Sequence, residues 1–596
     1  MIGLGLSLRK GGTASGDIFD IFVDSVGGDD LNSGTKRSEP LQTLTAALAA
    51  APSSRARIGL KRGSFWRESL DLSTITSPRV GAYGTGNPPR ISGTDVFSSW
   101  SKTAGRTNVY QTSVTYESGG RITVYEDDIL LERVADEATC DSTPGSFVKL
   151  LANTAGTSTL KIHASDSGNP SSNGKIYEVS VRRNGIYGVD NTIVSGIQTE
   201  KAISNNGSTD LVNRTNCIVS KILAANGTKH NLGIGAGFAE DCIVYLADDV
   251  TSEEPSSNPF VAFVNDGTGL TARFTRCGVI GPAPGNDFTA HGNPTSFDSV
   301  SLEQCWTLTQ GVASSMSVNV GCYVKSVANI PCLFGSTSML GAFIDNADAG
   351  TATPGQYSEV LVENTVASVK QKSVATQFQE VFRVNGSYPA VFNNCSFYCD
   401  TSLASGPATI WWANGDSNQD ITLTNSIIFN GAQLMILASG GSYVGDYNVF
   451  LAGQPGETRD VSFNHYSAGY LDTLAGWQAA TSQDLNSVYL KRADQTRGSS
   501  TAFWLCVAND EANSPHETGD YRVNPNAKVY GGDGTAHIGT FPDGTLITTV
   551  GAQKHWNWNT RAEENGPQTM WPQPPSTLEE SKTYILSPEG WNFYPN

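Results

Sequence analysis

A stretch of acidic residues with a single histidine, residues 240–303, is the part of the sequence best equipped for chemistry. In its segment NDFTAHG, Asp287 and His291 flank Phe288. A carboxylate near an imidazole can exchange protons close to neutral pH, as a general acid or base in glycoside hydrolysis must do. The same residues can instead be structural, with the aspartate capping a turn and the histidine bonded to a neighbouring segment. The other carboxylates of this stretch are Glu240, Asp241, Asp248, Asp249, Glu253, Glu254, Asp266, Asp298 and Glu303.

Three of those carboxylates, Asp248, Asp249 and Asp266, are further candidate catalytic residues. The first two belong to the acidic segment ADDVTSEEP, which could bind a hard cation, because Ca²⁺ takes roughly six to eight oxygen ligands. The segment lacks the Asp-x-Asp-x-Asp-Gly order of a dedicated calcium loop, and the histidines of the chain are dispersed. We therefore predict a solvated acidic loop, no metal site and no other cofactor.

Two adjacent indoles, Trp411 and Trp412 in ATIWWANGD, are candidate substrate-binding residues. Neighbouring side chains of a strand point to opposite faces, so one indole would pack in the core and the other could stack on a sugar ring. A structural role for both is the alternative. Lys201, Lys221 and Arg273 are cations that a lyase could use as a base, but their sequence surroundings do not distinguish them.

The composition excludes several classes of function. The 596 residues include 39 basic and 57 acidic ones, for a formal net charge of −18. Without clustered Lys and Arg, nucleic-acid binding is not expected, and no apolar run is long enough to predict a membrane span. The sequence has no P-loop, GxGxxG, GxSxG, HExxH or CxxC motif in a suitable context, so nucleotide-dependent catalysis, serine hydrolysis and thiol redox chemistry are not expected either.

The surroundings of the cysteines indicate the elements that must position these residues. A small residue is followed two positions later by a residue that is usually apolar, and in a strand these two side chains share one face. Variable spacings of mostly 20–50 residues are typical of a solenoid with inserted loops. We expect the small residues to stack in one interior column as reduced, buried groups, with disulfides as the alternative. They are Thr192, Cys217, Cys242, Cys277, Cys305, Cys322, Thr365, Cys395 and Ser426.

The position between these two residues points to the opposite face and is also mostly apolar. A solvated sheet face should be polar, so this stripe is expected to be covered, either by another chain around an axis or by inserted loops. A closed three-fold ring can bury one such stripe per subunit, which predicts a homotrimer. The stripe contains Ile218, Ile243, Trp306, Tyr323, Val366 and Ile427.

Segments at both ends of the repeat carry a further pattern. Near the start are GGDDLNSGT, LKRGSFWRESL and GTGNPPRISG, and near the end are SAGYLDTLAGWQAATSQDLNS and GDYRVNPNAKVYGGDG. Their order resembles the ends of the right-handed parallel β-helix proteins of the pectate-lyase-like superfamily. The resemblance covers about residues 20–541 and implies an all-β fold, a single-stranded right-handed parallel β-helix with an N-terminal capping helix and a C-terminal appendage.

The resemblance and the composition together divide the chain into six parts. Pro40 is expected to begin a capping helix over residues 40–51. The parts are a flexible leader or docking peptide (1–19), an N-terminal cap with the first coils (20–94), an antiparallel β elaboration (95–180), the β-helix body (181–460), a closing helix with further coils (461–541) and a Trp/Pro-rich tail (542–596).

Among proteins with this scaffold, the chain most resembles a bacteriophage tailspike or tail fibre, because no signal peptide is visible and the tail is unusual. This resemblance implies a virion protein that is made in the host cytoplasm and acts at the outer bacterial surface. It would recognise a bacterial surface polysaccharide and dock on other tail proteins through its leader. Cleavage of the polysaccharide, by hydrolysis rather than elimination, is the catalytic form of this hypothesis. The alternatives are a non-catalytic structural or receptor-binding tail protein and a bacterial polysaccharide lyase.

Overall fold

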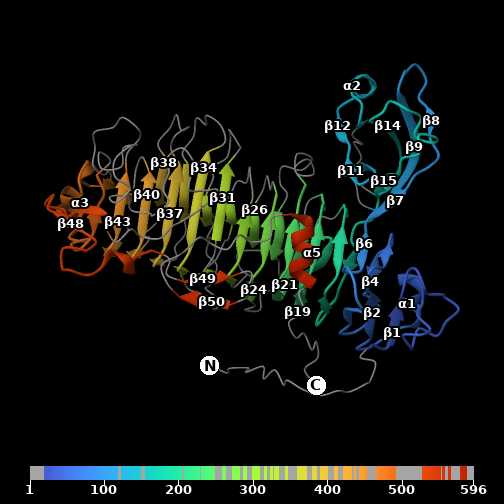
Figure 1. Ribbon diagram of the computed structural model, residues 1–596, viewed down its shortest axis with the longest axis horizontal. Coiled ribbons are helices and arrows are strands. Elements are labelled where there is room, and N and C mark those ends of the chain that lie inside the picture. Colours follow the sequence, from blue (N-terminus) through green and yellow to red (C-terminus); the bar gives the residue numbers. More distant parts are fainter. Residues whose placement is uncertain are drawn as a thin grey trace.

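A computed structural model shows a molecule built mostly of parallel β-sheets with few helices. One sheet has 21 strands and another has 15, and both run along the long axis of the molecule (Figure 1). The structure describes residues 19–117, 122–148, 155–203, 207–228, 230–247, 258–262, 271–281, 286–290, 299–308, 314–317, 322–325, 328–334, 342–346, 359–371, 379–384, 389–400, 408–413, 420–431, 435–437, 442–452, 463–465, 467–491, 526–551, 554–557, 562–565 and 577–586.

The strands of the two large sheets are short. The 21-stranded sheet contains β1 (Ile21–Val23), β2 (Arg57–Lys61), β4 (Leu70–Asp71), β5 (Arg79–Tyr83), β16 (Ile186–Tyr187), β17 (Ile193–Ser195), β19 (Thr209–Ser220), β21 (His230–Glu240), β23 (Asn258–Ala262), β24 (Thr271–Thr275), β26 (Asn286–Ala290), β27 (Ser299–Glu303), β29 (Ser314–Ser317), β30 (Cys322–Lys325), β32 (Ala342–Asn346), β33 (Val360–Glu363), β35 (Gln379–Val384), β36 (Ala390–Asn393), β38 (Ala408–Ala413), β39 (Asp420–Thr424) and β42 (Ser442–Asp446). The 15-stranded sheet contains β3 (Phe65–Trp66), β6 (Arg90–Ser92), β18 (Gln198–Glu200), β20 (Leu223–Ala225), β22 (Ile243–Tyr245), β25 (Gly278–Ile280), β28 (Trp306–Leu308), β31 (Ala328–Phe334), β34 (Val366–Gln371), β37 (Ser396–Asp400), β40 (Ile427–Gly431), β43 (Val449–Ala452), β46 (Val488–Tyr489), β47 (Lys528–Tyr530) and β48 (Ala536–Ile538).

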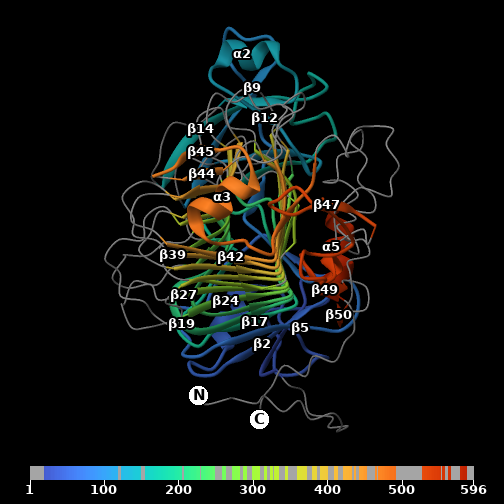
Figure 2. The ribbon, with the colours of Figure 1, turned by 90° about the vertical axis from the view of Figure 1, so that its left-hand side faces the viewer.

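Along the middle of the chain the pairing repeats every three strands. Parallel pairs join β24 to β27, β25 to β28 and β26 to β29, and the same offset continues to β42, β43 and β38. The chain therefore returns to the same stack of strands after every third strand. Viewed along the stack, successive strands lie one behind another (Figure 2).

Apolar side chains from these strands form one long core. The rings of Phe260 and Phe288, on paired strands, stack with their centroids 4.8 Å apart, and Phe274 meets each of them edge-on. All three side chains are at most 2% exposed. Alternation along each strand places one set of residues in this core and leaves the other on the outer surface.

Four cysteines form the interior column that the repeat predicted. The Gly278 N–H donates to the Cys242 carbonyl over 2.9 Å, and the Trp306 N–H donates to the Cys277 carbonyl over 3.0 Å. The same bonding pattern connects the positions of Thr365, Cys395 and Ser426 on later turns. The cysteines of this column, with Cys305 as the fourth, are fully buried free thiols.

Cys217 and Cys322 do not belong to this column, contrary to the sequence prediction. Cys217 pairs with Gly237, and Cys322 pairs with Val300, both within the 21-stranded sheet. Thr192 lies beside Cys217, because the Ile218 N–H donates to the Thr192 carbonyl. The predicted single column therefore merged two columns on different sheets.

In both columns the small residue follows a residue with a positive φ, which explains why the sequence prediction merged the two columns. Asn216 precedes Cys217 with φ = 54°, and Asp241 precedes Cys242 with φ = 53°. A residue in the left-handed region turns the chain sharply, and Asn and Asp tolerate this conformation best among residues with a side chain. Two corners of the repeat thus share one sequence signature, and spacing alone cannot separate them.

The apolar stripe on the 15-stranded sheet is covered by the C-terminal part of the same chain. Leu223, Ile243, Trp306, Val366, Ile427 and Val449 form a buried cluster with Phe541, Ile547, Val550 and Tyr584. We call residues 541–551 together with helix α5 (Leu578–Leu586) the C-terminal segment. Its helix α5 lies against the stack beside β20 and β22 (Figure 1). Ile218 and Tyr323, which were assigned to the same stripe, lie on the other sheet instead.

Specific hydrogen bonds fix the C-terminal segment to corners of successive turns. The Asn394 side chain donates to the carbonyls of Thr549 and Gly551. The Gly551 N–H donates to the Asn425 carbonyl, and the Tyr584 hydroxyl donates to the Asp241 carboxylate over 3.0 Å. The segment therefore bridges turns that are far apart along the stack.

The N-terminal helix α1 (Leu44–Ala50) begins four residues later than predicted. Thr43 is its N-cap and accepts a hydrogen bond from the Ala46 N–H, so Pro40 lies outside the helix. Leu44 and Ala47 are fully buried in the first turns of the core. A threonine hydroxyl satisfies a free helix N–H, which proline cannot do, and this cap sets the helix start.

The described residues between 94 and 180 form two small sheets that project from the side of the stack (Figure 1). All pairs in these sheets are antiparallel except β12–β13. The elements are β7 (Thr94–Val96), β8 (Ser101–Lys102), β9 (Val109–Tyr116), β10 (Val124–Glu126), β11 (Ile129–Leu130), β12 (Glu132–Val134), α2 (Glu137–Ser142), β13 (Ser146–Val148), β14 (Gly156–His163) and β15 (Tyr177–Ser180).

The remaining elements lie towards the C-terminus. They are β41 (Met435–Leu437), β44 (Phe463–His465), β45 (Gly469–Leu471), α3 (Leu474–Thr481), the 3₁₀ helix Ile547–Thr549, β49 (Lys554–Asn557) and β50 (Ala562–Asn565). Trp477 of α3 is fully buried against Phe463. Among the described residues, no helix combines the length and the apolar character that crossing a membrane requires.

Candidate functional site

The outer face of the 21-stranded sheet presents two parallel rows of side chains. We define the outer face as the side, away from the core, of ten strands that pair in succession. These strands are β17, β19, β21, β24, β27, β30, β33, β36, β39 and β42. Backbone pairing sets the first row of this face as Ile193, Ile218, Phe238, Arg273, Ser301, Tyr323, Leu361, Val391, Thr422 and Val444. Two residues further along each strand, the second row is Ser195, Ser220, Glu240, Thr275, Glu303, Lys325, Glu363, Asn393, Thr424 and Asp446.

The two rows differ in character. The first row is mostly apolar, and Ile218 and Val444 are 40% and 52% exposed. The second row is polar, and its carboxylates at Glu303, Glu363 and Asp446 are partly exposed. On eight of these strands the residue between the two rows belongs to the core, from Val194 to Leu423, so the strand alternation itself positions both rows. The result is a line of apolar groups beside a line of hydrogen-bonding groups.

Three of the four carboxylates in the second row already have protein partners. Asp446 accepts hydrogen bonds from the backbone N–H of Asn486 over 2.7 Å and from its side-chain amide over 2.8 Å. Glu363 accepts a hydrogen bond from the Tyr323 hydroxyl of the preceding paired strand over 3.1 Å. Glu240 is bound by the Arg276 guanidinium, which also donates to Asp241 over 2.8 Å. Burial would lower the pKa of Arg276, but its bonds to the two carboxylates outweigh this effect and raise the pKa. Among the described contacts of this row, Glu303 is the carboxylate whose side chain is not held by a neighbouring residue.

Asp287, the first of the predicted catalytic residues, is fully buried on β26. Its neighbour Phe288 packs in the core, so Asp287 lies on the opposite side of the strand. A carboxylate with no exposed surface cannot meet a polymer in solution without a rearrangement. His291, Asp248, Asp249 and Asp266 lie outside the described residues, and their catalytic role stays a prediction.

Trp411 and Trp412 lie on strand β38, as the sequence suggested. Trp411 pairs with Phe382 and Trp412 pairs with Arg383 of β35. The two residues are consecutive in a strand and so occupy opposite faces. The described structure covers their backbone only, and the sugar-stacking role stays a prediction.

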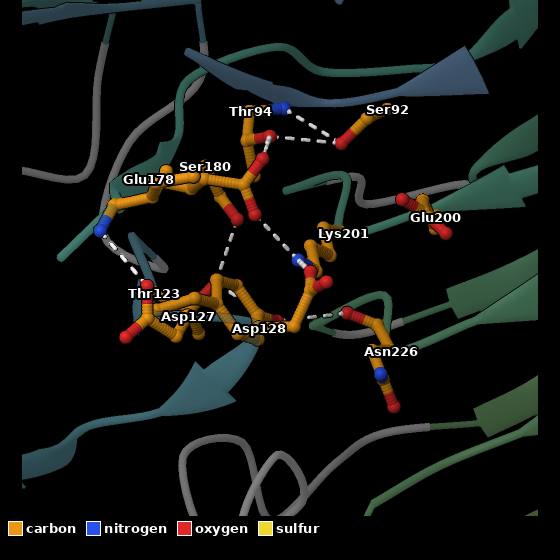
Figure 3. A network of polar contacts seen from close by, with 12 residues as sticks. Ser92, Thr94, Thr123, Asp127, Asp128, Glu178, Ser180, Glu200, Lys201 and Asn226 are labelled. Carbon is orange, nitrogen blue, oxygen red and sulfur yellow. Dashed lines mark hydrogen bonds and ion pairs between the residues drawn. The ribbon is translucent and has the colours of Figure 1, made fainter. Parts of the chain in front are cut away.

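A network of charged side chains at the junction between the small sheets and the stack was not predicted (Figure 3). The Lys201 ammonium lies 2.7 Å from a Glu178 oxygen and 2.5 Å from an Asp128 oxygen. It also lies 4.3 Å from the centre of the Tyr125 ring. Lys201 and Glu178 are each 5% exposed in their side chains, whereas Asp128 is 70% exposed.

The network extends through two arginines that both lie close to one aromatic ring. Arg67 binds Glu178 and Arg90 binds Glu200, each with an N–O distance of 2.6 Å. Both guanidinium groups lie within 4.7 Å of the Phe65 ring centre. Since Glu178 belongs to β15 and the arginines belong to the first turns of the stack, the network fixes the small sheets to the stack.

The charges of this network do not suit a lyase base. Burial would lower the pKa of Lys201, but its hydrogen bonds to Asp128 and Glu178 outweigh burial and raise the pKa. A lysine with a raised pKa stays protonated at neutral pH and cannot accept a proton. Sequence alone missed this network because its paired members are up to 111 residues apart and follow no motif.

No metal site is found among the described residues, and no protein family can be assigned to the chain. Within the described part of the chain, no three His, Cys, Asp or Glu side chains converge as metal ligands would. No protein-family model matches the sequence. No curated protein matches it either.

Comparison with solved structures finds carbohydrate-related proteins at low similarity. A structure described as XylC in complex with xylose has a TM-score of 0.40 at 10% identity, covering 72% of this chain and 83% of that one. A glycoside hydrolase has a TM-score of 0.34 at 8% identity over 75% and 94% of the two chains. A GH136 lacto-N-biosidase from Eubacterium ramulus has a TM-score of 0.26 at 10% identity over 72% and 67%. Scores of this size transfer neither a substrate nor a reaction to this chain.

Proposed function

We propose that this chain is a right-handed parallel β-helix that binds a bacterial surface polysaccharide along its outer face, as a bacteriophage tailspike or tail fibre. The three-strand repeat with parallel pairing supports the β-helix, and the terminal segments that resemble the pectate-lyase-like superfamily support its handedness. The single observation that carries the binding function is the pair of in-register rows on the outer face. The homotrimer, the virion location and docking through residues 1–19 belong to the same proposal.

The geometry of the rows suits a linear glycan that runs parallel to the stack. Neighbouring strands are about 4.7–4.9 Å apart, close to the length of one sugar unit. Successive strands thus offer mostly apolar side chains for the C–H faces of the sugars and polar side chains for their hydroxyls, except at the buried Ser195, Ser220 and Ser301. Because the strands are hydrogen-bonded to each other, little side-chain or backbone freedom is lost on binding.

Hydrolysis at this face would use carboxylates of the second row. Glu303 and Glu363 stand two strands apart, with Lys325 between them. Their backbones are therefore roughly 9–10 Å apart, near the upper end of the ~6.5–9.5 Å carboxyl separation of inverting glycosidases. We propose this pair as an alternative to the Asp287–His291 pair, and we expect inversion of configuration if it is the catalytic one.

Binding can be tested with purified full-length protein and polysaccharide extracted from candidate host strains. In the double variant Glu303→Gln/Glu363→Gln, we expect the affinity to fall about 100-fold. This follows because hydrogen bonds to charged groups contribute roughly 1.5–3 kcal/mol each and 1.4 kcal/mol is a factor of ten. Glu132→Gln, an exposed carboxylate on the small sheets, is the matched control and should bind normally. An unchanged affinity in the double variant would overturn the assigned face.

The reaction itself is distinguished by its products. New reducing ends and a falling molecular mass would support hydrolysis, and a rise in ultraviolet absorbance would indicate elimination and a lyase instead. Binding without either change would support the non-catalytic receptor-binding alternative. Sedimentation of the purified chain tests the trimer, and a stable monomer would remove that part of the proposal.

A further inference from the structure

A serine and a histidine at the end of β14 form a hydrogen-bonded pair that the proposed function does not use. The Ser167 hydroxyl lies 2.9 Å from Nε2 of His163. On the other side of the ring, Nδ1 of His163 lies 2.8 Å from the carbonyl oxygen of Cys140. A nucleophile within hydrogen-bond reach of a base, which is itself oriented by a third group, is the arrangement of an activated serine.

The carbonyl oxygen of Cys140 sets the tautomer of the ring. A carbonyl can only accept, so Nδ1 of His163 must carry the hydrogen that it donates. In the neutral imidazole Nε2 is then an acceptor, and the Ser167 hydroxyl donates to it. This is the tautomer that a general base needs, and the Cys140 carbonyl takes the orienting role that an aspartate has in the serine protease triad.

Ser167 is also exposed and held in a strained backbone conformation. Its φ of 58° lies in the left-handed region, which costs energy for a residue with a side chain. The turn is fixed by the Ser167 N–H donating to the Ala164 carbonyl and by the Gly168 N–H donating to the Asp166 carboxylate. Ser167 is thus an exposed residue whose hydroxyl is hydrogen-bonded to Nε2 of an imidazole that is 1% exposed.

We propose that Ser167 and His163 form a serine esterase site. The Ser167 oxygen attacks the carbonyl carbon of an ester while its proton moves to Nε2 of His163. The bond to the alkoxide leaving group then breaks, and the proton passes from His163 to the leaving oxygen. Water, deprotonated in turn by His163, attacks the acyl carbon of the acyl-serine. The bond from this carbon to the Ser167 oxygen then breaks, the oxygen takes the proton back from His163, and the carboxylic acid is released.

The surroundings of the serine indicate the class of ester. The side chains next to it in the turn, Ser165, Asp166 and Asn169, are polar and exposed. Such a surface suits a hydroxylated ligand better than a fatty acyl chain, so we assign a short acyl group carried on a sugar hydroxyl. This choice of substrate rests on the proposed function, whereas the esterase chemistry does not.

The described turn limits the expected rate. The backbone N–H groups of Ser167 and Gly168 are both engaged within the turn, so neither can stabilise an oxyanion in this conformation. Loss of one such donor costs an enzyme about 10²–10³-fold in rate, while a positioned general base contributes about 10²–10⁴-fold. We therefore expect an acceleration that comes from the base alone, about 10²–10⁴-fold over the uncatalysed reaction.

The test uses the full-length chain, p-nitrophenyl acetate and a fluorophosphonate that labels activated serines. We expect hydrolysis above background and a label on the peptide that contains Ser167. Ser167→Ala should lose both, and His163→Gln should lower both at least 100-fold. Ser172→Ala, which removes another exposed hydroxyl of the same loop, is the matched control and should behave as the parent chain.

Two results would overturn the proposal. One is the absence of label on Ser167 in folded protein, and the other is unchanged hydrolysis in Ser167→Ala. Because His163 is buried, its variant is interpreted only if it unfolds at the same temperature as the parent, and Ser167→Ala decides the matter otherwise. Polysaccharide binding should persist in Ser167→Ala, and ester hydrolysis should persist in Glu303→Gln/Glu363→Gln, so the two proposals can fail separately.

Discussion

Replacement of Lys201 by methionine tests the view that the charged network fixes the small sheets to the stack. Methionine keeps the length of the side chain and removes its charge, which leaves the buried Glu178 carboxylate without one of its two cationic partners. Breaking a buried ion pair by removing one partner typically costs about 3–5 kcal/mol. Glu178 keeps Arg67 at 2.6 Å and the exposed Asp128 can return to water, so we expect the lower end, about 3 kcal/mol.

The assay is denaturant unfolding of the full-length chain, followed by a probe of the small sheets such as protease sensitivity between residues 94 and 180. A chain of this size need not unfold in one step, so the local probe is compared with circular dichroism of the whole molecule. Lys36→Met is the control, because Lys36 forms an exposed ion pair with Glu39 and should change the stability very little.

A second substitution separates loss of the ion pair from loss of packing. In Lys201→Met, the further change Glu178→Gln removes the stranded charge and should restore part of the lost stability. Coupling energies between residues in contact are typically about 0.5–3 kcal/mol. A loss below about 1 kcal/mol in Lys201→Met, or purely additive effects in the double variant, would refute the assigned role of the network.

Four further outcomes follow from the described contacts. Lys201 lowers the pKa values of Glu178 and Asp128, although burial opposes this effect. The contribution of these two carboxylates to the stability of the fold is therefore present above pH 4.5 and is lost as the pH falls further. The stability of Lys201→Met should accordingly fall less steeply with acidification than that of the parent chain. Tyr584→Phe removes the hydrogen bond to Asp241 and should cost about 1 kcal/mol in thermal unfolding. Asp484→Ala leaves the buried donors of Tyr443 and Trp477 without their acceptor, and calorimetry should show that the free energy of unfolding falls by at least about 3 kcal/mol. The buried column thiols should react with a thiol reagent only after denaturation.

The sequence contains most of the information on the repeat but not on its register. A small residue followed by an apolar one gives the strand and its inner face, because strand alternation is strict. It does not reveal which corner of the repeat the pattern marks, since Asn216, within β19 of one sheet, and Asp241, before β22 of the other, adopt the same left-handed conformation. Only the pairing of Cys217 with Gly237 resolves the two columns.

The candidate site was harder to predict for a related reason. Glu303 was among the acidic residues noted in the sequence, but Glu363 and Asp446 were not, because the row they share exists only once the register is known. Insertions of different lengths separate the members of the row along the chain. The Ser167–His163 pair was missed because it follows no nucleophile motif, and its orienting group is a main-chain carbonyl, which leaves no trace in the residue types.

The cover on the 15-stranded sheet changes which surface a trimer would use. The apolar stripe first suggested contact between subunits, but Ile243, Trp306 and Val366 are already buried together with Tyr584 of the same chain. A second chain could reach them only by displacing the C-terminal segment or by exchanging it with its own copy.

The variant Tyr584→Phe distinguishes an exchanged C-terminal segment from one that stays within its own chain. An exchanged segment would make assembly weaker in this variant, whereas a segment held within each chain would lower the unfolding temperature and leave the subunit equilibrium unchanged. Asn394 and Asn425 form hydrogen bonds with residues 549–551, the other part of the C-terminal segment, within the same chain. We therefore expect a lower unfolding temperature with an unchanged subunit equilibrium, and any trimer contact on another surface.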